Sequence, residues 1–396
     1  MKIIVSGGFA HSLVNFRGDL LQRLRSEGHE VLALAAEEDS RIYETLQSWG
    51  IEYRSIPLRR SGMNPYHDFI YLLSLVKLFR QEKPGLLMAY THKPVIYGSM
   101  AAAIAGVPHV AAIITGLGYV FSNTGTIRGK ISLRVVQLLY RISMKKIGIV
   151  FFQNEDDIQL FRERKLLANR PSIHKLNGSG VSLKKFEFQA FSEEQIEEAQ
   201  AGRVVFLMMS RLLREKGVYE YVQAARLIRE NWPDVRFRLI GPHDPSPGAV
   251  ADEDIQAWVQ EGLIEYQPWV DHPLPHYAAA HVFVLPSYYR EGLPRTLIEA
   301  MAVGRPIITA DTPGCRDTIR SSDSERLSEA HPVALGENGI KILPRDPHAL
   351  AVAMSRFLQN PDRIVEMGIR GREFAESSFD VEKVNDQIME ALYATD

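Results

Sequence analysis

The strongest constraint on the fold of this chain is a regular alternation of short apolar segments with amphipathic ones, in two successive runs. In the first run, the apolar segments predict strands at 2–6, 30–35, 86–90, 109–115, 147–153 and 172–176. Between them, apolar residues at helical spacing predict helices that include 95–105, 130–146 and 155–168. Strands that alternate with helices form a parallel sheet covered by helices on both faces.

The second run begins near residue 204 and has the same rhythm. Its expected strands are 204–209, 235–240, 264–267, 282–286, 306–310 and 339–343, and its expected helices are 217–230, 252–261, 294–303, 347–359, 361–376 and 381–393. Glu187–Gly202 is expected to be a linker with a short acidic helix. The sequence therefore predicts an α/β protein with two Rossmann-like domains, 1–186 and 203–378, that face a cleft, while the helix near 379–396 packs back on the first. Ligands of such domains bind at the carboxyl ends of the strands.

Charge is distributed unevenly between the two halves. The net charge is −2, yet residues 1–190 carry +10 and residues 191–396 carry −12. The halves are therefore expected to have different partners, and the basic half suits phosphates or an anionic membrane. Cys315 is the single cysteine, which excludes an internal disulfide and a cysteine zinc cluster.

Targeting and membrane-spanning segments are not expected. Residues 1–5 are apolar but too short for a signal peptide. The uncharged stretch 94–127 is long enough to span a membrane, but it contains turn and loop residues at Gly106-Val-Pro108 and from Gly116 to Asn123. Such irregular backbone argues against a span.

The first motif is Met209-Ser-Arg211-Leu-Leu-Arg-Glu-Lys216-Gly217, which follows an expected strand and opens an expected helix. Arg211 and Lys216 beside the free backbone N–H groups of a helix N-terminus would form a phosphate site. An ordinary solvated loop is the alternative.

The second motif runs from Pro286 to Ala300 and contains Glu291-Gly-Leu-Pro294 and Glu299. Eight residues of helix rise about 12 Å, so Glu291 and Glu299 are spaced to contact the sugar and the ribose of a nucleotide diphosphate sugar. The helix N-terminus would face the diphosphate between them. Alternatively, Glu299 pairs with other side chains in a purely structural role, because a carboxylate near the core needs partners.

These motifs resemble those of the family 4 retaining glycosyltransferases, which have the GT-B fold, and the resemblance covers essentially the whole chain. Arg211 and Lys216-Gly217 resemble the family's diphosphate-binding pair. Glu291 and Glu299 match two glutamates separated by seven residues, with Gly292, Leu293 and Pro294 as in the family. Asn177-Gly178 and Val181…Phe186 resemble a hinge segment, but Ser182 stands where aspartate is usual.

One branch of the family shares Thr91-His92-Lys93-Pro94, Thr115-Gly116-Leu117-Gly118 and Pro313-Gly314-Cys315-Arg316. Enzymes of that branch extend polyprenyl-diphosphate-linked sugars in bacterial glycan, O-antigen or capsule assembly, and several transfer N-acetylgalactosamine. The resemblance therefore implies a UDP-sugar donor, a lipid-linked saccharide acceptor, and a cytoplasmic enzyme peripheral on the inner face of the plasma membrane. A UDP-sugar 2-epimerase of the same fold and a non-catalytic nucleotide-sugar binder are the alternatives.

The chain departs from many relatives after the strand that ends at Ile114, where Thr115-Gly116 replaces a histidine that touches the transferred sugar. His92 and the backbone of the glycine loop are candidates to supply the missing contact, although His92 at a strand end can also be structural. Gly8 is expected on the donor side. Candidate acceptor-binding residues are His11, Arg17, Thr115 and Gly116, with Arg17 either a phosphate ligand or a solvated helix residue.

The helix 130–146 and its surroundings are basic. From Ser122 to Asn154 there is no acidic residue, while six cations occur: Arg128, Lys130, Arg134, Arg141, Lys145 and Lys146. Such a helix can lie on an anionic leaflet, or it can cover its own sheet with a solvated basic edge. Because aromatic residues are not interleaved with these charges, no nucleic acid is expected.

No metal or other cofactor is expected. Asp252-Glu-Asp254 has the form of a metal motif, but it falls at a probable helix start, where acids favour the dipole. Arg211 and Lys216 would instead stabilise the charge that develops on a leaving diphosphate.

Overall fold

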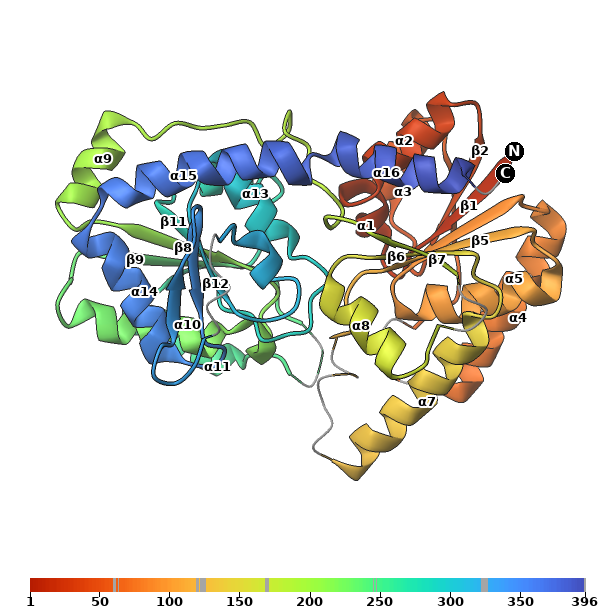
Figure 1. Ribbon diagram of the computed structural model, residues 1–396, viewed down its shortest axis with the longest axis horizontal. Coiled ribbons are helices and arrows are strands. Elements are labelled where there is room, and N and C mark those ends of the chain that lie inside the picture. The colour runs from red at the N-terminus through yellow and green to blue at the C-terminus, as the bar shows by residue number, and fades with distance from the viewer. Residues whose placement is uncertain are drawn as a thin grey trace. The chain divides into compact units, whose positions relative to one another are not determined.

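The computed structural model describes residues 1–59, 62, 64–118, 121, 126–167, 171–244, 246, 248–321 and 327–394. The chain forms two compact units, Met1–Gly180 together with Val381–Asp396, and Val181–Asp380 (Figure 1). The chain therefore enters the second unit after Gly180 and returns to the first after Asp380. Residues 181–186, which the sequence analysis placed in the first domain, lie in the second unit together with the linker segment.

The first unit is built on one parallel sheet. Its strands are β1 (Lys2–Ser6), β2 (Glu30–Ala35), β3 (Glu52–Ser55), β4 (Leu86–Tyr90), β5 (His109–Ile114), β6 (Ile149–Phe152) and β7 (Ser172–Lys175). They are arranged in the order β3-β2-β1-β4-β5-β6-β7. All strands of this sheet except the edge strands β3 and β7 are largely buried and almost purely apolar, as expected for parallel strands covered on both faces.

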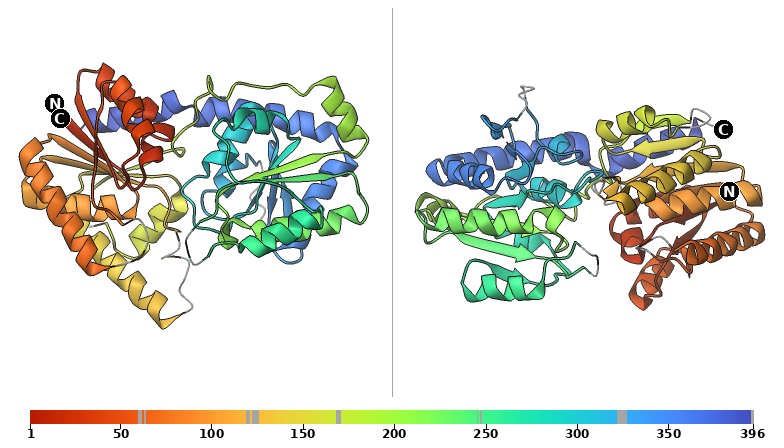
Figure 2. Two further views of the ribbon diagram at one scale, coloured as in Figure 1. Left: turned by 180° about the vertical axis from the view of Figure 1, so that it is seen from behind. Right: turned by 90° about the horizontal axis from the view of Figure 1, so that it is seen from below.

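Helices cover both faces of this sheet (Figures 1 and 2). One hydrophobic core lies under α1 (Ala10–Asn15), α2 (Gly18–Ser26), α3 (Ser40–Ser48) and the returning helix α16 (Val381–Tyr393). The other lies under α4 (Pro65–Glu82), the π-helical turn η1 (Pro94–Gly98), α5 (Ser99–Ala105), α7 (Ile127–Ser143) and α8 (Glu155–Glu163). Helix α7 begins three residues before the predicted 130 because the Thr126 hydroxyl accepts a hydrogen bond from the Gly129 N–H and caps the helix there.

The second unit repeats this plan. Its strands are β8 (Val205–Met209), β9 (Arg236–Ile240), β10 (Glu265–Gln267), β11 (Val282–Leu285), β12 (Ile307–Ala310), β13 (Val333–Leu335) and β14 (Gly339–Ile342). They are arranged in the order β10-β9-β8-β11-β12-β14-β13, with only β13 antiparallel among these strands. The helices and turns are α9 (Glu193–Gln200), η2 (Arg214–Lys216), α10 (Val218–Arg229), α11 (Asp252–Gln260), α12 (Leu274–Ala278), α13 (Arg295–Val303), η3 (Arg316–Thr318), α14 (Pro347–Gln359), α15 (Asp362–Phe374) and η4 (Ala375–Phe379).

The predicted α/β class with two Rossmann-like sheets is confirmed. Among the described helices and strands, those that were not predicted include α3, β3, α4, α12 and the short antiparallel β13. No described helix is both long and apolar enough to cross a membrane.

Candidate active site

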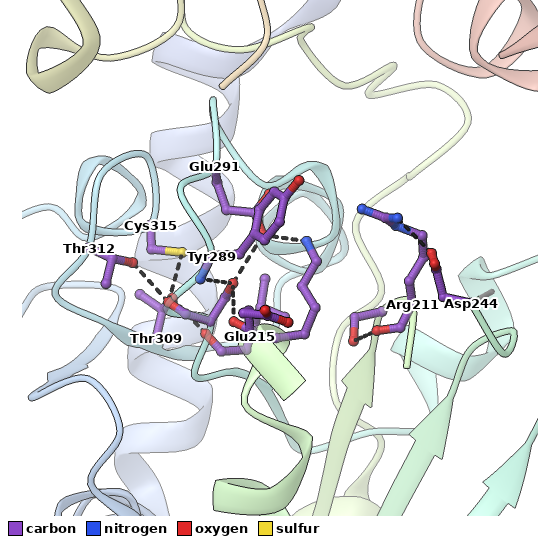
Figure 3. Close-up of polar contacts among 12 residues, drawn as sticks. Arg211, Glu215, Asp244, Tyr289, Glu291, Thr309, Thr312 and Cys315 are labelled. Carbon is purple, nitrogen blue, oxygen red and sulfur yellow. Dashed lines mark hydrogen bonds and ion pairs between the residues drawn. The ribbon is translucent and has the colours of Figure 1, made fainter. Parts of the chain in front are cut away.

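In the second unit, the strand order reverses between β8 and β11, and ligands of such sheets bind at the carboxyl ends of the strands at this point. Arg211 and Lys216 follow β8, and Glu291 follows β11. Figure 3 shows Arg211 and Glu291 on the loops that leave the two strands. The fold thus brings together residues that are 75 or more positions apart in the sequence.

Lys216 forms an ion pair with Glu291, and both side chains are largely buried. The Ser287 hydroxyl donates to Glu291 Oε1 over 3.0 Å, and the Lys216 ammonium lies 5.3 Å from the centre of the Tyr289 ring. The backbone N–H groups of Tyr288 and Tyr289 both donate to the Glu215 carbonyl at 2.9 Å. These bonds tie the loop after β11 to the turn η2 and hold the ion pair in place.

Arg211 is held differently. Its Nη1 lies 2.7 Å from Asp244 Oδ2, and Asp244 belongs to the loop after the adjacent strand β9. Burial acts to raise the pKa of Asp244, but hydrogen bonds from Ser246 and the Arg211 charge outweigh it and lower that pKa. Asp244 was not predicted, because it becomes a partner of Arg211 only when β8 and β9 pair.

Glu299 lies in α13 and is mostly buried, with a partner for each carboxylate oxygen. Oε1 accepts from Arg295 Nε at 2.8 Å, and Oε2 accepts from the Tyr277 hydroxyl at 3.0 Å. Glu299 therefore pairs with other side chains here, as the structural alternative predicted. A ribose would have to join or replace Arg295 and Tyr277 as its partners.

The start of α13 is suited to an anion. The helix begins at Arg295, with Pro294 in the N-cap position, and no side chain caps its first N–H groups. Leu293 is buried in the hydrophobic core, so its backbone rather than its side chain is suited to a ligand. Gly292 packs against Gly314, where a Cβ would lie 2.1 Å from the Gly292 carbonyl oxygen. The Pro313–Arg316 loop thus supports the Glu291 loop.

Beneath this loop lies a small buried polar layer. The Thr312 hydroxyl donates to the Ser287 carbonyl at 2.9 Å, and Cys315 Sγ lies 3.9 Å from the same oxygen. Burial raises the pKa of the Cys315 thiol to about 12, so the thiol is neutral and supports the loop by packing. Ser287 and Thr312 were not predicted, since single hydroxyl residues carry no sequence signal.

In the first unit, the strand order reverses between β1 and β4. Gly7 and Gly8 follow β1, and Cβ atoms added there would lie 2.2 Å from the Tyr90 hydroxyl and 2.9 Å from Thr91 Oγ1, respectively. A side chain at either glycine would therefore collide with Tyr90 or Thr91 at the end of β4 unless that side chain moved. Thr91 itself has a φ of 66°, a strained value for a non-glycine residue.

Two of the predicted acceptor residues lie next to this point. His11 Nε2 is 3.1 Å from Asp39 Oδ2. Arg17 is only 2% exposed, and its guanidinium lies 5.2 Å from the centre of the Tyr90 ring. The prediction that Arg17 could be a solvated helix residue is wrong, because Arg17, at the N-cap position of α2, is almost entirely buried.

His92 follows β4, and Thr115-Gly116 follows the neighbouring strand β5. The His92 Nδ1 lies 2.7 Å from the Tyr140 hydroxyl of α7. Burial lowers the pKa of His92 to about 4, so the imidazole is neutral at pH 7. Gly116 has a φ of 99°, in the left-handed region that favours glycine.

The next residue, Lys93, is held by a buried carboxylate. Its ammonium lies 2.7 Å from Asp68 Oδ1, and the Tyr97 hydroxyl donates to Asp68 Oδ2 over 3.1 Å. Asp68 and Tyr97 belong to α4 and η1, so this cluster fixes the segment that carries His92.

The two acids of the Asp252-Glu-Asp254 motif have other partners. Asp252 pairs with His243 at 2.6 Å, and Asp254 accepts a hydrogen bond from the Tyr219 hydroxyl. Within the described ranges, no group of three or more histidine, cysteine or acidic side chains is arranged to hold a metal ion.

Comparison with known protein families gives two matches. Residues 15–173 match a glycosyl transferase 4-like domain, and residues 203–360 match glycosyl transferases group 1. Each match falls within one of the two units, and together they span most of the chain.

Two curated relatives are similar along much of their length. The chain is 24% identical to the N,N'-diacetylbacillosaminyl-diphospho-undecaprenol alpha-1,3-N-acetylgalactosaminyltransferase of Campylobacter jejuni, over 90% of this chain and 96% of the relative. It is 28% identical to the UDP-Gal:alpha-D-GlcNAc-diphosphoundecaprenol alpha-1,3-galactosyltransferase of Escherichia coli, over 70% of this chain and 71% of the relative.

Solved structures agree in fold. The sucrose-phosphate synthase of Thermosynechococcus elongatus superposes with a TM-score of 0.76 at 17% identity, and Anabaena HepE in complex with UDP with a TM-score of 0.73 at 18% identity. Each superposition covers 100% of this chain and 100% of the solved chain. Together with the two domain matches and the loop residues at both strand-order reversals, these similarities show that the chain is a glycosyltransferase of family 4 with the GT-B fold.

Proposed function

We propose that this glycosyltransferase moves a hexose or an N-acetylhexosamine from a UDP-sugar to a polyprenyl-diphosphate-linked saccharide, with retention of anomeric configuration, in bacterial surface polysaccharide or glycan assembly. The observation that carries the proposal is the gathering of Arg211, Lys216 and Glu291 at the strand-order reversal of the second unit. The two curated relatives, whose printed names describe transfer to diphospho-undecaprenol-linked sugars, support the acceptor class.

The donor would bind with its diphosphate between the two cations and the start of α13. The diphosphate then competes with Asp244 for Arg211 and with Glu291 for Lys216. Glu291 would accept hydrogen bonds from hydroxyls of the transferred sugar, and Glu299 from those of the ribose. The balance of charge supports this arrangement, because each cation is paired with a carboxylate that a diphosphate can replace.

The chemical step needs no protein nucleophile in this proposal. The acceptor oxygen bonds to the anomeric carbon as the bond to the leaving phosphate oxygen breaks on the same face. The acceptor proton passes to that phosphate oxygen. Arg211 and Lys216 stabilise the departing UDP, which is electrostatic catalysis with positioning.

With these cations, the reaction should run without a metal, so a saturating chelator should leave most activity in place. Loss that magnesium restores would refute metal independence.

The acceptor would bind to the first unit, where Gly7-Gly8, Thr115-Gly116 and His92 follow strands and His11 lies in the first turn of α1. Neutral His92 would donate or accept a hydrogen bond to the acceptor or the sugar. The net charge of +10 on residues 1–190 favours a location at the anionic inner face of the plasma membrane.

The test is to screen UDP-sugars for UDP release with a short polyprenyl-diphosphate-sugar acceptor. We expect release that requires the acceptor, and a product whose anomeric coupling constant matches that of the donor. An inverted product would refute retention. Interconversion of UDP-sugars without acceptor would indicate the 2-epimerase alternative, and binding without turnover of any donor would indicate a nucleotide-sugar binder.

A further inference from the structure

Helix α7 has two apolar faces. Val136 and Tyr140 are buried against the sheet of the first unit. Five large apolar residues of the same helix are exposed, with exposed fractions from 79% at the first to 41% at the last: Ile127, Ile131, Val135, Leu138 and Ile142. Their spacings of four, four, three and four residues place them on one stripe along the helix.

This stripe lies on the side of α7 opposite the buried face, since the repeat of about 3.6 residues turns Val136 and Tyr140 away from it. A helix that only covers its own sheet presents polar residues on its outer side. The outer surface of α7 therefore carries an apolar stripe in addition to a solvated basic edge. Contiguous exposed apolar surface of this kind marks an interaction site.

Cations border the stripe. Lys130, Arg134 and Arg141 are exposed and fall along one edge of it in the helical repeat. The Arg128 side chain lies outside the described part of the chain. No acidic residue occurs between positions 122 and 154. The surface thus combines apolar side chains with positive charge, and α7 itself carries no acidic residue.

Some of the cations also have structural roles. Arg141 Nη2 donates to the Arg164 carbonyl at 2.8 Å, and the Lys146 ammonium donates to the Pro108 carbonyl at 3.2 Å. Replacing them would disturb packing within the first unit as well as any contact outside it. Lys130 and Arg134 are the better positions at which to test the charge.

We propose that the outer face of α7 docks on an anionic lipid bilayer, with the apolar stripe among the acyl chains near the headgroups and the bordering cations at the lipid phosphates. Charge favours this occupant over a second copy of the chain, because two such faces packed on a two-fold axis would bring their cations together. The inference rests on the proposed function in one respect, since a lipid-linked acceptor requires the enzyme to work at a membrane.

The same helix links the bilayer to the site. Tyr140, on the inner face of α7, is hydrogen-bonded to His92 at the end of β4. Helix α7 therefore connects the proposed membrane-facing surface with His92, a proposed contact of the acceptor or the sugar.

The test uses the full chain with vesicles of phosphatidylglycerol and phosphatidylcholine, and with vesicles of phosphatidylcholine alone, without donor or acceptor. We expect co-sedimentation with the anionic vesicles that weakens as salt is added. The double variant Ile131→Asn/Leu138→Asn should bind the anionic vesicles about tenfold more weakly, or more weakly still. The double variant Lys130→Gln/Arg134→Gln should lose the salt-sensitive part of the binding. The matched control is Val352→Asn/Ile369→Asn, which removes comparably exposed apolar residues from the second unit and should bind as the wild type does.

Insertion is measured separately with an environment-sensitive fluorophore on Leu138→Cys. The native Cys315 is fully buried and should remain unlabelled. We expect a blue shift on adding anionic vesicles, and none for the same label on Val352→Cys. No binding of the wild type at low salt, or unchanged binding of Ile131→Asn/Leu138→Asn, would overturn the proposal.

Two further outcomes are distinguishable. Self-association of the wild type in sedimentation velocity without lipid, abolished in Ile131→Asn/Leu138→Asn, would assign the stripe to a second copy and overturn the proposal. Turnover with a short, water-soluble acceptor should be the same in this variant and in the wild type. Failure of that turnover in both proteins would count against the proposed function, whatever the vesicles show.

Discussion

Arg211 and Lys216 both pair with carboxylates, but they lie in different surroundings. The Arg211 side chain is 44% exposed, whereas that of Lys216 is only 12% exposed. Arg211→Ala should lower kcat/KM by about 10²-fold with little change in Tm, since one charge contact in the transition state is worth a few kcal/mol. Lys216→Ala should lower kcat/KM similarly and also lower Tm, because it leaves the Glu291 carboxylate buried without its cation.

Steady-state kinetics and thermal unfolding check this pair of results. The double variant Lys216→Ala/Glu291→Ala should recover much of the lost Tm but none of the activity. A near-wild-type rate in either folded single variant would show that the replaced cation does not stabilise the leaving group.

The two glutamates should separate in their effect on UDP. Glu299→Ala should weaken UDP binding, because the proposed ribose contact exists without the sugar. Glu291→Ala should leave UDP binding intact or stronger, since Lys216 is then released from its carboxylate, yet turnover should be lost. Calorimetric titration with UDP measures both affinities. Equal losses of affinity in the two variants would contradict the proposed division of roles.

His92 should make stability depend on pH. Its folded pKa of about 4 lies below the ordinary value of 6.5 because the ring is buried, so the unfolded chain binds the proton more readily. Stability from this group is therefore complete above about pH 6.5 and is lost as pH falls towards 4, by about 2 kcal/mol at pH 5. Urea unfolding of the wild type and of His92→Asn at pH 7 and pH 5 should show a smaller loss in the variant. The same loss in both would refute the assignment.

Residues within a motif could be predicted from the sequence, whereas their partners could not. Arg211, Lys216 and Glu291 were identified from their places after expected strands. Asp244 and Tyr140 were missed because only tertiary structure brings them to Arg211 and His92. Arg17 shows the same limit, because nothing in the sequence around a lone arginine indicates that it will be buried between two helices.

Gly217, which ends the turn η2, allows this turn to lie close to β11 and so positions Lys216. This residue has a φ of 83°, and a Cβ there would lie 2.5 Å from the Pro286 carbonyl oxygen at the end of β11. Gly217→Ala should therefore push η2 away from the Glu291 loop, with a marked loss of kcat/KM and of Tm.

Gly28 provides the matched control. It has a φ of 85°, but a Cβ there meets nothing within 4 Å. Gly28→Ala should cost only the backbone strain of about 1 kcal/mol and leave activity unchanged. If Gly217→Ala behaved like Gly28→Ala, close approach of η2 to β11 would not position Lys216.

The elements that could be predicted are those with a single clear period. Strands such as β4 and β11 are continuous apolar runs, and both were predicted. Helix α4 was missed because it exposes Phe69 and Leu73 while it buries Tyr71 and Leu75, which hides the helical period. β3 was missed because Glu52–Ser55 is a polar edge strand, and its hydrogen bonds to β2 leave no pattern in the sequence.

The returning helix α16 belongs to the first unit, where Ile388 is fully buried in the core under α2. Ile388→Asp should place a carboxylate in that core and destabilise the first unit. Hydrogen exchange should then quicken in β1, β2 and α2 but not in β8–β12. Gln387→Asp, one position earlier and exposed, is the control and should leave exchange unchanged. Equal acceleration in both units would show that they do not unfold separately.

The return of the chain after Asp380 also affects folding during synthesis on the ribosome. Domains of multidomain proteins generally fold in the order in which they are made. Here the apolar groove for Ile388 and its neighbours on the first unit stays uncovered until α16 emerges, after all of residues 181–380. The second unit begins later in the chain, yet it is therefore the first unit whose segments have all been translated. Nascent chains that pause before residue 381 carry an open hydrophobic surface on the first unit, which chaperones can bind.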